Sequence, residues 1–296
     1  MAERTLTVGS AAPVRLDTFV RAALPLLSQR RARLWIAAGT VRVNGRPAAK
    51  GTLLGADDQV TLPAPEGLCP EPDLPVRVLH EDAELVAIDK PGGMPTHALD
   101  PAQRGTTAAF LLARYPEMAG VGSALAPGLV HRLDTGTSGV LLAARSAAIY
   151  ADLRAALRSR TVEKRYLALV VGRMSAGTRV RLALAHDPSD RRRMVPARAT
   201  GRAWPAETAV DVVQSGTARS LVAVTIRTGV THQVRVHLAH IGHPVLGDTL
   251  YGGPPTDLPA GRHALHASDL SFVHPGRRQP MHLASELPPE LQALLL

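Results

Sequence analysis

Residues 128–146 read GLVHRLDTGTSGVLLAARS, and this stretch decides how the centre of the chain is organised. The apolar residues at either end have the composition of strands, whereas the glycines, threonines and serine between them indicate a loop. One carboxylate, Asp134, stands on that loop two residues after Arg132. An aspartate in such a loop is usually a turn former, because its side chain accepts hydrogen bonds from nearby backbone N–H groups. A chemical role for Asp134 needs support from the rest of the chain.

The composition is that of a globular protein. The chain has 296 residues, of which 45% are hydrophobic, and this length is enough for more than one domain. No apolar run approaches the roughly 20 residues that cross a bilayer, and the first residues, MAERTLTVGS, lack the pattern of a signal peptide. A single cysteine, Cys69, rules out an internal disulfide and fits a reducing compartment. We therefore expect a cytoplasmic protein with no membrane partner.

The net charge of +9 predicts a polyanionic partner, with nucleic acid the first candidate. Only three of the 34 basic residues are lysines, and arginine both forks onto phosphates and stacks on bases. GC-rich coding also favours arginine, so the Arg-to-Lys ratio has two explanations, but coding bias does not account for the positive sign. Aromatic residues make up 3% of the chain, which argues against a broad stacking platform for single strands.

Residues 13–62 have the pattern of a small α/β domain with two short helices and a hairpin. We expect the first helix to begin with Asp17 as its N-cap and to end or kink at Pro25, and the second to begin with Ser28 as its N-cap. In the following VRVNGRPA, Asn44 and the glycine after it are a strong hairpin signal. The candidates for RNA contact in this domain are Arg30, Arg31, Arg33 and Asn44.

Residues 63–75, PAPEGLCPEPDLP, carry five prolines and predict a stiff, extended linker. In residues 76–296, strands joined by short turns outnumber helices, and Ser146 and Thr231 are the expected N-caps of two helices. The sequence therefore predicts an α+β fold. Its larger domain has a central, largely antiparallel mixed sheet flanked by helices, and a small N-terminal α/β domain precedes it.

Two parts of the chain resemble known families. Residues 15–62, through RLDTFV, LSQRRARLWIAAG and VRVNG, resemble the RNA-binding module of the ribosomal-protein-S-four type. Four further stretches, DKPGGMPTH, GLVHRLDTGTSGVLLAA, EKRYLALVVG and TGVTHQVRVHLAHIGHPVLGDTLYG, resemble the RluA/RluD-type family of pseudouridine synthases. The combination of HRLD-x-x-TSG with THQ, an apolar residue, R, an apolar residue and H is highly specific. The resemblance covers nearly the whole chain and implies that residues 76–296 are a pseudouridine synthase domain.

The resemblance also implies a set of three catalytic residues. Asp134 matches the family's catalytic aspartate, and Arg235 matches the arginine that pairs with it. Tyr166 matches the tyrosine that stacks on the target base and takes part in proton removal. Arg132 matches the arginine that fills the gap left by the flipped nucleotide. The further expected RNA contacts in this domain are His131, Thr231 and His232.

One position departs from the family's pattern. The family usually has TGRTHQ, and here Val230 stands in place of the arginine. An arginine that would contact the RNA or a loop is therefore missing. This bears on target affinity or target choice more than on the chemistry, because Asp134, Tyr166 and Arg235 are all present.

The chemistry of uridine isomerisation suits these residue types. The base–ribose bond breaks, the base turns and a new bond forms through carbon 5, so no redox step and no group carrier is needed. We expect no cofactor and no metal, and the sequence has no Walker A motif, dinucleotide fingerprint or Cys-rich metal site. A carboxylate can act as nucleophile or base, and a bidentate arginine would keep it ionised and aimed. The small residues of the loop would let a ribose and a flipped base approach closely.

Three other features have competing interpretations. Ser138 lacks the Gly-x-Ser-x-Gly elbow of a hydrolase nucleophile. The arginines at 191–193 are either a solvated charge run or a contact to an RNA backbone. Four histidines suggest a metal site, but no cysteine and no His-Glu-x-x-His pattern supports it. These histidines are His232, His237, His240 and His243.

The leading hypothesis is a monomeric pseudouridine synthase that acts on structured RNA, with large-subunit ribosomal RNA favoured over tRNA. The second is an RNA-binding or ribosome-assembly factor with a degenerate synthase domain, and the third is a metal-dependent RNA hydrolase. The sequence does not name the target uridine. It also leaves the first step open between attack of Asp134 on the ribose, attack on the base, and removal of the 2′ proton.

Overall fold

The computed structural model describes residues 3–9, 13–24, 27, 29–63, 67–197 and 201–295. The chain forms two compact units. The first unit contains Met1–Asp73 and His97–Pro127, and the second contains Leu74–Thr96 and Gly128–Leu296. The domain boundaries expected from the sequence stay a prediction.

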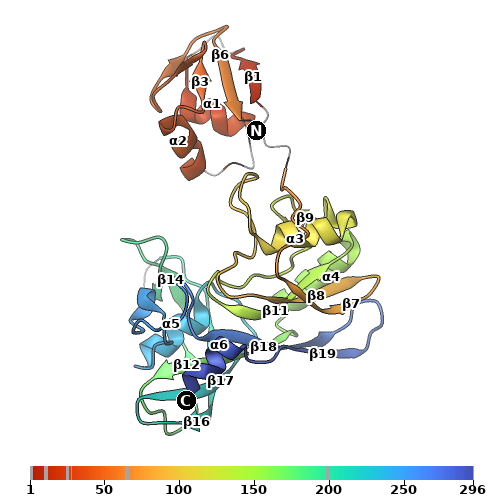
Figure 1. Ribbon diagram of the computed structural model, residues 1–296, viewed down its shortest axis with the longest axis vertical. Coiled ribbons are helices and arrows are strands. Elements are labelled where there is room, and N and C mark those ends of the chain that lie inside the picture. The colour runs from red at the N-terminus through yellow and green to blue at the C-terminus, as the bar shows by residue number, and fades with distance from the viewer. Residues whose placement is uncertain are drawn as a thin grey trace. The chain divides into compact units, whose positions relative to one another are not determined.

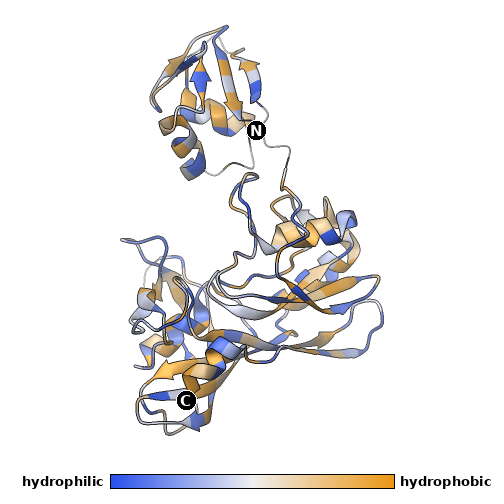
Figure 2. Ribbon diagram, in the orientation of Figure 1, coloured by the Kyte–Doolittle hydropathy of each residue, from blue (hydrophilic) through white to orange (hydrophobic). Residues whose placement is uncertain are grey.

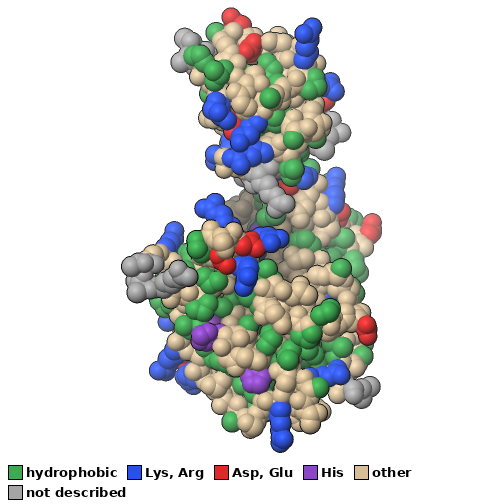
Figure 3. Space-filling view, turned by 90° about the vertical axis from the view of Figure 1, so that its left-hand side faces the viewer, with side chains coloured by type: hydrophobic (Ala, Val, Ile, Leu, Met, Phe, Trp, Pro, Cys, Tyr) green, Lys and Arg blue, Asp and Glu red, His purple; other side chains and the backbone are tan. Residues whose placement is uncertain are grey.

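A small module with its own core, here called the N-terminal module, spans residues 3–63 (Figure 1). Helices α1 (Leu16–Ala23) and α2 (Gln29–Ala37) pack on a four-stranded sheet in the order β1-β6-β3-β4. The strands are β1 (Glu3–Thr7), β3 (Arg42–Val43), β4 (Arg46–Pro47) and β6 (Gln59–Pro63), and β2 (Val14–Arg15) pairs with β5 (Leu53–Leu54). Several Lys and Arg side chains lie on the face of this module that Figure 3 shows.

The structure confirms the hairpin and corrects the start of the first helix. Asn44 and Gly45 both have positive φ, 49° and 78°, which is the backbone of the tight turn that joins β3 to β4. Asp17 is not the N-cap: Arg15 is, and Asp17 lies in the first turn, where it accepts a hydrogen bond of 3.1 Å from Arg15 Nε. The roles predicted for Pro25 and Ser28 lie outside the described residues.

The rest of the first unit contains one helix and a short hairpin. Thr106 is the N-cap of α3, and its hydroxyl accepts a hydrogen bond of 3.2 Å from the Ala109 N–H. Capping by threonine satisfies an amide that the helix itself leaves unpaired. The elements are α3 (Thr107–Arg114), the 3-10 helix η1 (Pro116–Met118), β9 (Gly122–Ser123) and β10 (Ala126–Pro127).

A nine-stranded sheet organises the second unit (Figure 1). The strand order is β13-β16-β17-β12-β18-β11-β8-β7, and β19 pairs with β18. All of these pairs are antiparallel except β11 with β18, so the predicted α+β fold with a largely antiparallel mixed sheet is confirmed. The strands are β7 (Arg77–Glu81), β8 (Leu85–Lys90), β11 (Ser138–Ala144), β12 (Glu163–Val171), β13 (Thr178–Arg181), β16 (Glu207–Ser215), β17 (Arg219–Ile226), β18 (Leu265–Val273) and β19 (Pro280–Ala284).

The core of this unit lies between the sheet and α4 (Ala147–Arg158). All seven residues of β11 are buried, and the strands of the sheet carry mostly hydrophobic residues (Figure 2). Ile149 and Leu153, one turn apart on α4, pack against Val140 and Leu142. Ser146 is the N-cap of α4, as predicted, and accepts a hydrogen bond from the Ile149 N–H.

The remaining elements of the second unit are short. Helix α5 packs against β15 and β16. No helix in the described part of the chain has the length and apolar character needed to cross a membrane. These elements are β14 (Leu184–His186), β15 (Met194–Pro196), α5 (Gln233–His240), η2 (Thr249–Tyr251), α6 (Pro289–Gln292) and η3 (Ala293–Leu295).

Candidate active site

Asp134 lies on the loop that leads into β11, at the one place among the described strands of the sheet where two strands run parallel. Two glycines, Gly136 on this loop and Gly139 near the start of β11, fit tightly against the segment before β18 and against β18 itself. A Cβ on Gly136 would lie 2.3 Å from the Gly261 carbonyl oxygen, and a Cβ on Gly139 would lie 2.1 Å from that of Ala267. The expectation that small residues make room for ribose and base is therefore wrong for these glycines, because they make room for the protein's own backbone.

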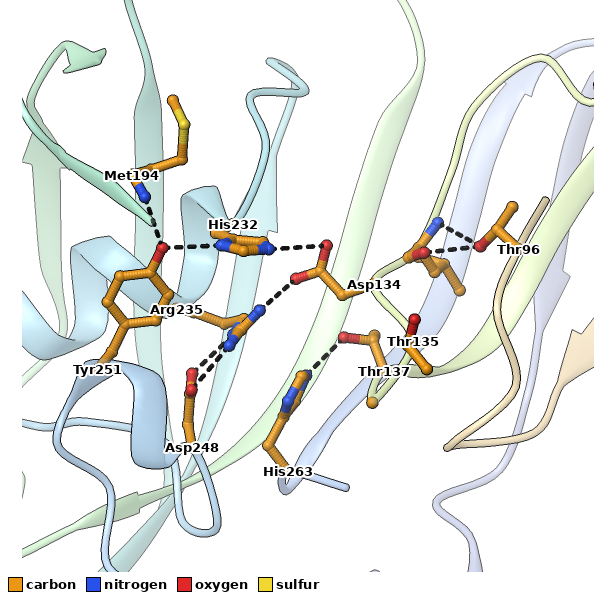
Figure 4. Close-up of polar contacts among 12 residues, drawn as sticks. Thr96, Asp134, Thr135, Thr137, Met194, His232, Arg235, Asp248, Tyr251 and His263 are labelled. Atoms are coloured by element: carbon orange, nitrogen blue, oxygen red, sulfur yellow. Dashed lines mark hydrogen bonds and ion pairs between the residues drawn. The ribbon is translucent and has the colours of Figure 1, made fainter. Parts of the chain in front are cut away.

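Buried polar groups hold the loop from several sides. Lys90, which is fully buried, donates to the carbonyl oxygens of Pro91, Met94 and Thr135 at 2.7–3.2 Å. Burial lowers the pKa of Lys90 to about 7, and the three carbonyl acceptors match the three N–H groups of an ammonium. Thr96 donates to the Leu133 carbonyl and accepts from the Leu133 N–H (Figure 4). The backbone on both sides of Asp134 is thus fixed.

Two residues just before β18 hold the same loop. The Arg262 guanidinium donates to the Gly136 carbonyl at 2.5 Å and to the Ser138 hydroxyl at 2.8 Å. His263 shares a hydrogen bond of 2.8 Å with the Thr137 hydroxyl (Figure 4). Burial, followed by the charge of Arg235, lowers the pKa of His263 to about 3, so this ring is neutral at physiological pH. Ser138 has a structural partner on each side, since it also bonds to His266.

Arg235 comes from α5, whose start differs from the prediction. The N-cap is His232, with φ 56° and ψ 16°, and not Thr231. Positive φ at a residue other than glycine is uncommon and turns the chain sharply. Thr231 is exposed, and the turn at His232 directs the first residues of α5 into the protein, where Arg235 is 7% exposed.

Two further polar side chains anchor α5 to its neighbours. Gln233 accepts a hydrogen bond from the Val230 N–H and donates to the Glu207 carbonyl. The two ring nitrogens of His237 contact the Thr208 hydroxyl at 2.8 Å and the Leu182 carbonyl at 3.0 Å. Of the residues in the THQVRVH motif, Gln233 and His237 therefore fix the helix, which leaves Arg235 to face Asp134.

Arg235 binds two carboxylates at once (Figure 4). Its Nη1 donates to Asp134 Oδ2 at 2.9 Å, so the two residues that the family resemblance predicted to pair are in contact. The bidentate contact expected for Asp134 is made instead to Asp248, through Nε and Nη2 at 2.7 Å each. The guanidinium carbon also lies 5.0 Å from the centre of the Tyr251 ring. Asp248 and Tyr251 thus set the orientation of Arg235 independently of Asp134.

His232 connects Asp134 with Tyr251 on the other side. Its Nδ1 bonds to the Tyr251 hydroxyl at 2.8 Å, and its Nε2 lies 3.8 Å from Asp134 Oδ1 (Figure 4). The Tyr251 hydroxyl also accepts a hydrogen bond from the Met194 N–H on β15. Sequence reasoning missed Asp248 and Tyr251, although both lie in the GDTLYG segment that carried the family resemblance.

The electrostatics keep the Asp134 carboxylate ionised. Burial by itself raises the pKa of this carboxyl, but His232 and Arg235 outweigh it and lower the pKa below its ordinary value. Burial lowers the pKa of His232 and outweighs the opposing effect of Asp134. Arg235 stays protonated, because Asp248 and Asp134 outweigh its desolvation and raise its pKa. The site therefore holds a carboxylate beside a permanent cation.

Tyr166 lines the same pocket as Asp134, from β12. The pairing of β12 with β18 shifts register between Arg165 and Leu167, so the bulge falls at Tyr166. Bulges commonly redirect a side chain next to an active site. Burial, followed by the charge of Asp134, raises the pKa of the Tyr166 phenol, which stays protonated at neutral pH. Its hydroxyl has no hydrogen-bond partner among the residues that the structure describes.

These residues surround an open cavity of about 350 Å³, within the range that takes one small molecule. Its lining combines Asp134, Arg235 and Tyr166 with apolar side chains such as Leu157 and Leu265. The residues predicted to contact RNA in this domain also line it, namely His131, Arg132, Thr231 and His232. The three predicted catalytic residues are thus brought together from three different elements.

Several predicted RNA contacts have a defined local setting. His131 accepts a hydrogen bond of 3.0 Å from the Leu142 N–H through Nε2, so that nitrogen is occupied within the protein. Asn44 bonds to Asp58 and to the Gln59 N–H. Val230 packs in a small apolar cluster with Leu184, Met194, Ala206 and Val236. Arg30, Arg31 and Arg33 lie on α2 of the N-terminal module.

The histidines that suggested a metal site have other neighbours. His237 is bonded as described above, and His243 Nδ1 lies 2.8 Å from the Val171 carbonyl. Within the described ranges, no group of three or more His, Cys, Asp or Glu side chains is arranged to hold a metal ion.

Comparison with known proteins supports the resemblance seen in the sequence. The profile of the RNA pseudouridylate synthase family matches residues 84–240, and that of the S4 domain matches residues 14–60. A protein of Xanthomonas campestris named ribosomal large subunit pseudouridine synthase D is 36% identical over 97% of this chain and 89% of its own length. An uncharacterized RNA pseudouridine synthase of Chloroflexus aurantiacus is 39% identical over 95% of this chain and 89% of its own length.

Solved structures of pseudouridylate synthases have a similar fold. The human RNA pseudouridylate synthase domain containing 4 superposes with a TM-score of 0.58 at 27% identity, over 74% of this chain and 91% of its own. The human RNA pseudouridylate synthase domain containing 1 gives a TM-score of 0.59 at 26% identity, over 74% of this chain and 86% of its own. The family and fold expected from the sequence are both confirmed.

Proposed function

Because the chain belongs to the RNA pseudouridylate synthase family and is a pseudouridine synthase, we propose that it isomerises specific uridines of large-subunit ribosomal RNA. Two observations support this substrate. Relatives at 31–36% identity are named ribosomal large subunit pseudouridine synthase D, and the chain carries an RNA-binding S4 domain at residues 14–60. We further propose that the protein acts on this RNA in the cytoplasm and as a monomer.

The reaction begins with removal of the target uridine from its helix. An enzyme that works on a base in structured RNA must first flip the nucleotide out, which costs a few kcal/mol of unstacking. Arg132 is exposed at the pocket and makes no side-chain hydrogen bond or ion pair with the described part of the chain. Its guanidinium is free to fill the space that the nucleotide leaves.

Asp134 then acts on the flipped nucleotide, and the observation that carries this role is its 2.9 Å contact with Arg235. The bond between N1 and C1′ breaks, the base turns, and a bond forms between C5 and C1′. The proton on C5 leaves to solvent and N1 takes up a proton, so atoms and charge balance. An ionised carboxylate can attack C1′, attack the base, or remove the 2′ proton, and each of these requires the charge that Arg235 maintains.

Tyr166 holds the base during this sequence. Stacking of an aromatic side chain on a base contributes about 1–3 kcal/mol and excludes water from the detached ring. Because the pKa of the phenol is raised, Tyr166 enters the reaction protonated. It is therefore a hydrogen-bond donor to the turning base, and it can accept the C5 proton only when it gives up its own.

Release of tritium from carbon 5 tests this function. Ribosomal RNA labelled at C5 of uridine is incubated with the protein in a buffer free of metal ions, and label in water is counted. We expect release by the wild type and a loss of at least about a hundredfold in rate for Asp134→Asn. The absence of release from any cellular RNA would favour an RNA-binding or assembly factor. Release that EDTA abolishes would favour a metal-dependent reaction.

Mapping of pseudouridines identifies the target. We expect one or more sites of large-subunit ribosomal RNA to lose pseudouridine in a deletion strain and to regain it with the wild-type gene but not with Asp134→Asn. Loss confined to tRNA would overturn the ribosomal assignment while leaving the activity intact.

A further inference from the structure

Apart from Arg235, which binds Asp134 and Asp248, four arginine and lysine residues line the active-site pocket, and the catalytic scheme uses only one of them, Arg132. The others are Arg154, Arg158 and Lys164, which all line the cavity. Arg154 and Arg158 are four residues apart on α4, so their side chains lie on the same face of the helix one turn apart. Lys164 is the second residue of β12, two positions before Tyr166.

None of these four cations is neutralised by the protein. In the part of the chain that the structure describes, Arg132, Arg154, Arg158 and Lys164 form no ion pair. Arg154 donates to the Val130 carbonyl and Lys164 to the Thr228 carbonyl, each at 2.8 Å. These contacts hold the side chains in position and leave their charges unbalanced. The acid in the pocket lining, Asp134, already has Arg235 as its partner.

The arrangement is unfavourable for the isolated protein. Like charges at positions i and i+4 destabilise a helix, and α4 places Arg154 and Arg158 in that relationship without an acidic residue among the pocket's lining on the same helix. The neighbouring His131 stays neutral: burial, followed by the charges of Lys164 and Arg154, lowers its pKa to about 3. An anion bound between these side chains would offset the repulsion among them.

The rest of the lining indicates which part of a nucleotide meets this cluster. Tyr166, Leu157, Ile226 and Leu265 supply aromatic and apolar surface, which suits a base. The anionic part of a ribonucleotide is its phosphate, and guanidinium groups bind phosphate oxygens with short, charge-assisted hydrogen bonds. We propose that Arg154, Arg158 and Lys164 form a subsite for the phosphate group attached to the target uridine. This proposal rests on the proposed function, because it places that uridine in the pocket.

Binding of small nucleotides tests the subsite without requiring turnover. Affinities of uridine, uridine 5′-monophosphate and uridine 3′-monophosphate are measured by ligand-observed NMR for the wild type, Arg154→Gln, Arg158→Gln and the double variant. We expect the wild type to prefer one monophosphate over uridine by about tenfold, the effect of one hydrogen bond to a charged group. The identity of the preferred monophosphate shows on which side of the uridine the phosphate is held.

The double variant should lose this preference and keep the affinity for uridine itself. Arg173→Gln is the matched control, because Arg173 is exposed, forms no ion pair with the described residues and is not among the residues that line the pocket. It should keep the preference. Equal binding of uridine and both monophosphates to the wild type would overturn the subsite, and so would an unchanged preference in the double variant. Thermal melting should show no loss of stability for Arg158→Gln, because Arg158 forms no side-chain hydrogen bond or ion pair with the described residues.

Tritium release from labelled ribosomal RNA separates this proposal from the function on which it rests. We expect the double variant to lose about tenfold in kcat/KM, mainly through KM, because the phosphate contact is made equally in the ground state and the transition state. Release by the wild type together with no monophosphate preference sinks the subsite alone. A monophosphate preference without any release sinks the proposed reaction and leaves a uridine nucleotide site.

Discussion

The guanidinium of Arg235 holds Asp248 with two hydrogen bonds of 2.7 Å, so the residue that orients Asp134 is itself oriented by a second carboxylate. The side chain of Asp248 is 1% exposed, whereas that of Asp134 is 17% exposed and opens on the pocket. Because the guanidinium is fixed to the buried Asp248, it has little freedom to follow the partly exposed Asp134 if that residue moves. The Arg235–Asp248 pair therefore holds the guanidinium in a fixed position beside the Asp134 carboxylate.

Removal of Arg235 should damage stability and activity separately. Arg235→Met leaves Asp248 buried without its cation, and the loss of one partner of a buried pair typically costs about 3–5 kcal/mol in the free energy of unfolding. The double variant Arg235→Met with Asp248→Leu should recover most of that loss, because it buries no unpaired charge. Denaturant unfolding gives the stabilities.

Tritium release from the same variants measures their activity, for comparison with their stability. The double variant should stay inactive although it is stable, since Asp134 loses the guanidinium that orients it and helps to keep it ionised. Asp248→Asn should lower kcat more than it changes KM, because Arg235 loses its orientation and keeps its charge. A fully active double variant would show that Arg235 serves only to stabilise the fold.

The pH dependence of kcat/KM should show no acid limb from Asp134 above pH 4 in the wild type. The pKa of this carboxyl is lowered from its ordinary value of 3.8, so the ionised form is present above that value and is lost only as pH falls further. The stability that this ionisation contributes follows the same course and disappears as pH falls through the folded-state pKa. In Arg235→Met only His232 is left as a main opponent of burial, so the pKa of Asp134 should rise and the acid limb should move to higher pH.

Arg173→Met is the control for that profile, because it removes an exposed arginine and should leave the limb where it is in the wild type. A wild-type limb close to pH 6 that vanishes in His232→Gln would show that His232, and not Asp134, governs the profile. That result would contradict the assignment.

Substitutions of Tyr166 should separate the ring from the hydroxyl. Tyr166→Phe keeps the stacking surface, so RNA affinity should be unchanged while kcat falls. Tyr166→Ala should also weaken binding, by roughly 1–3 kcal/mol for a stacked base. Single-turnover tritium release and equilibrium RNA binding measure the two effects. An unchanged kcat in Tyr166→Phe would remove the phenol from proton transfer and leave only stacking.

The loop that carries Asp134 should tolerate no side chain at Gly139. This residue has φ +112°, and an added Cβ would lie 2.1 Å from the Ala267 carbonyl oxygen on the parallel strand. We expect Gly139→Ala to reduce the free energy of unfolding by about 3 kcal/mol or more, because backbone on both sides has to move. Gly120→Ala is the matched control: it has φ +84° with nothing within 4 Å of the added Cβ, and it should cost about 1–2 kcal/mol. Equal losses would show that the close packing of the loop is not what Gly139 provides.

The sequence predicted those features that depend on neighbours along the chain. Ser146 could be identified as an N-cap because capping is a contact over three residues, and the Asn44 hairpin follows from the positive φ that these residues accept. The prediction failed at Asp17 and Thr231, because the N-caps are Arg15, two residues before Asp17, and His232, one residue after Thr231. Those starts are set by contacts outside the helix, such as the bond of Gln233 to the Glu207 carbonyl.

By itself the sequence determined the family and the fold class, and it predicted Asp134, Tyr166 and Arg235 as one catalytic set, because motifs record residue types at fixed spacing. The tertiary structure decided what each does to the others. In the folded chain Arg235 donates two hydrogen bonds to Asp248. Gly136 and Gly139 pack against the segment before β18 and against β18 itself. The tertiary structure also gathered Arg154, Arg158 and Lys164 beside the pocket. Distances between side chains 13 or 101 residues apart depend on how a sheet pairs its strands, and no local pattern encodes them.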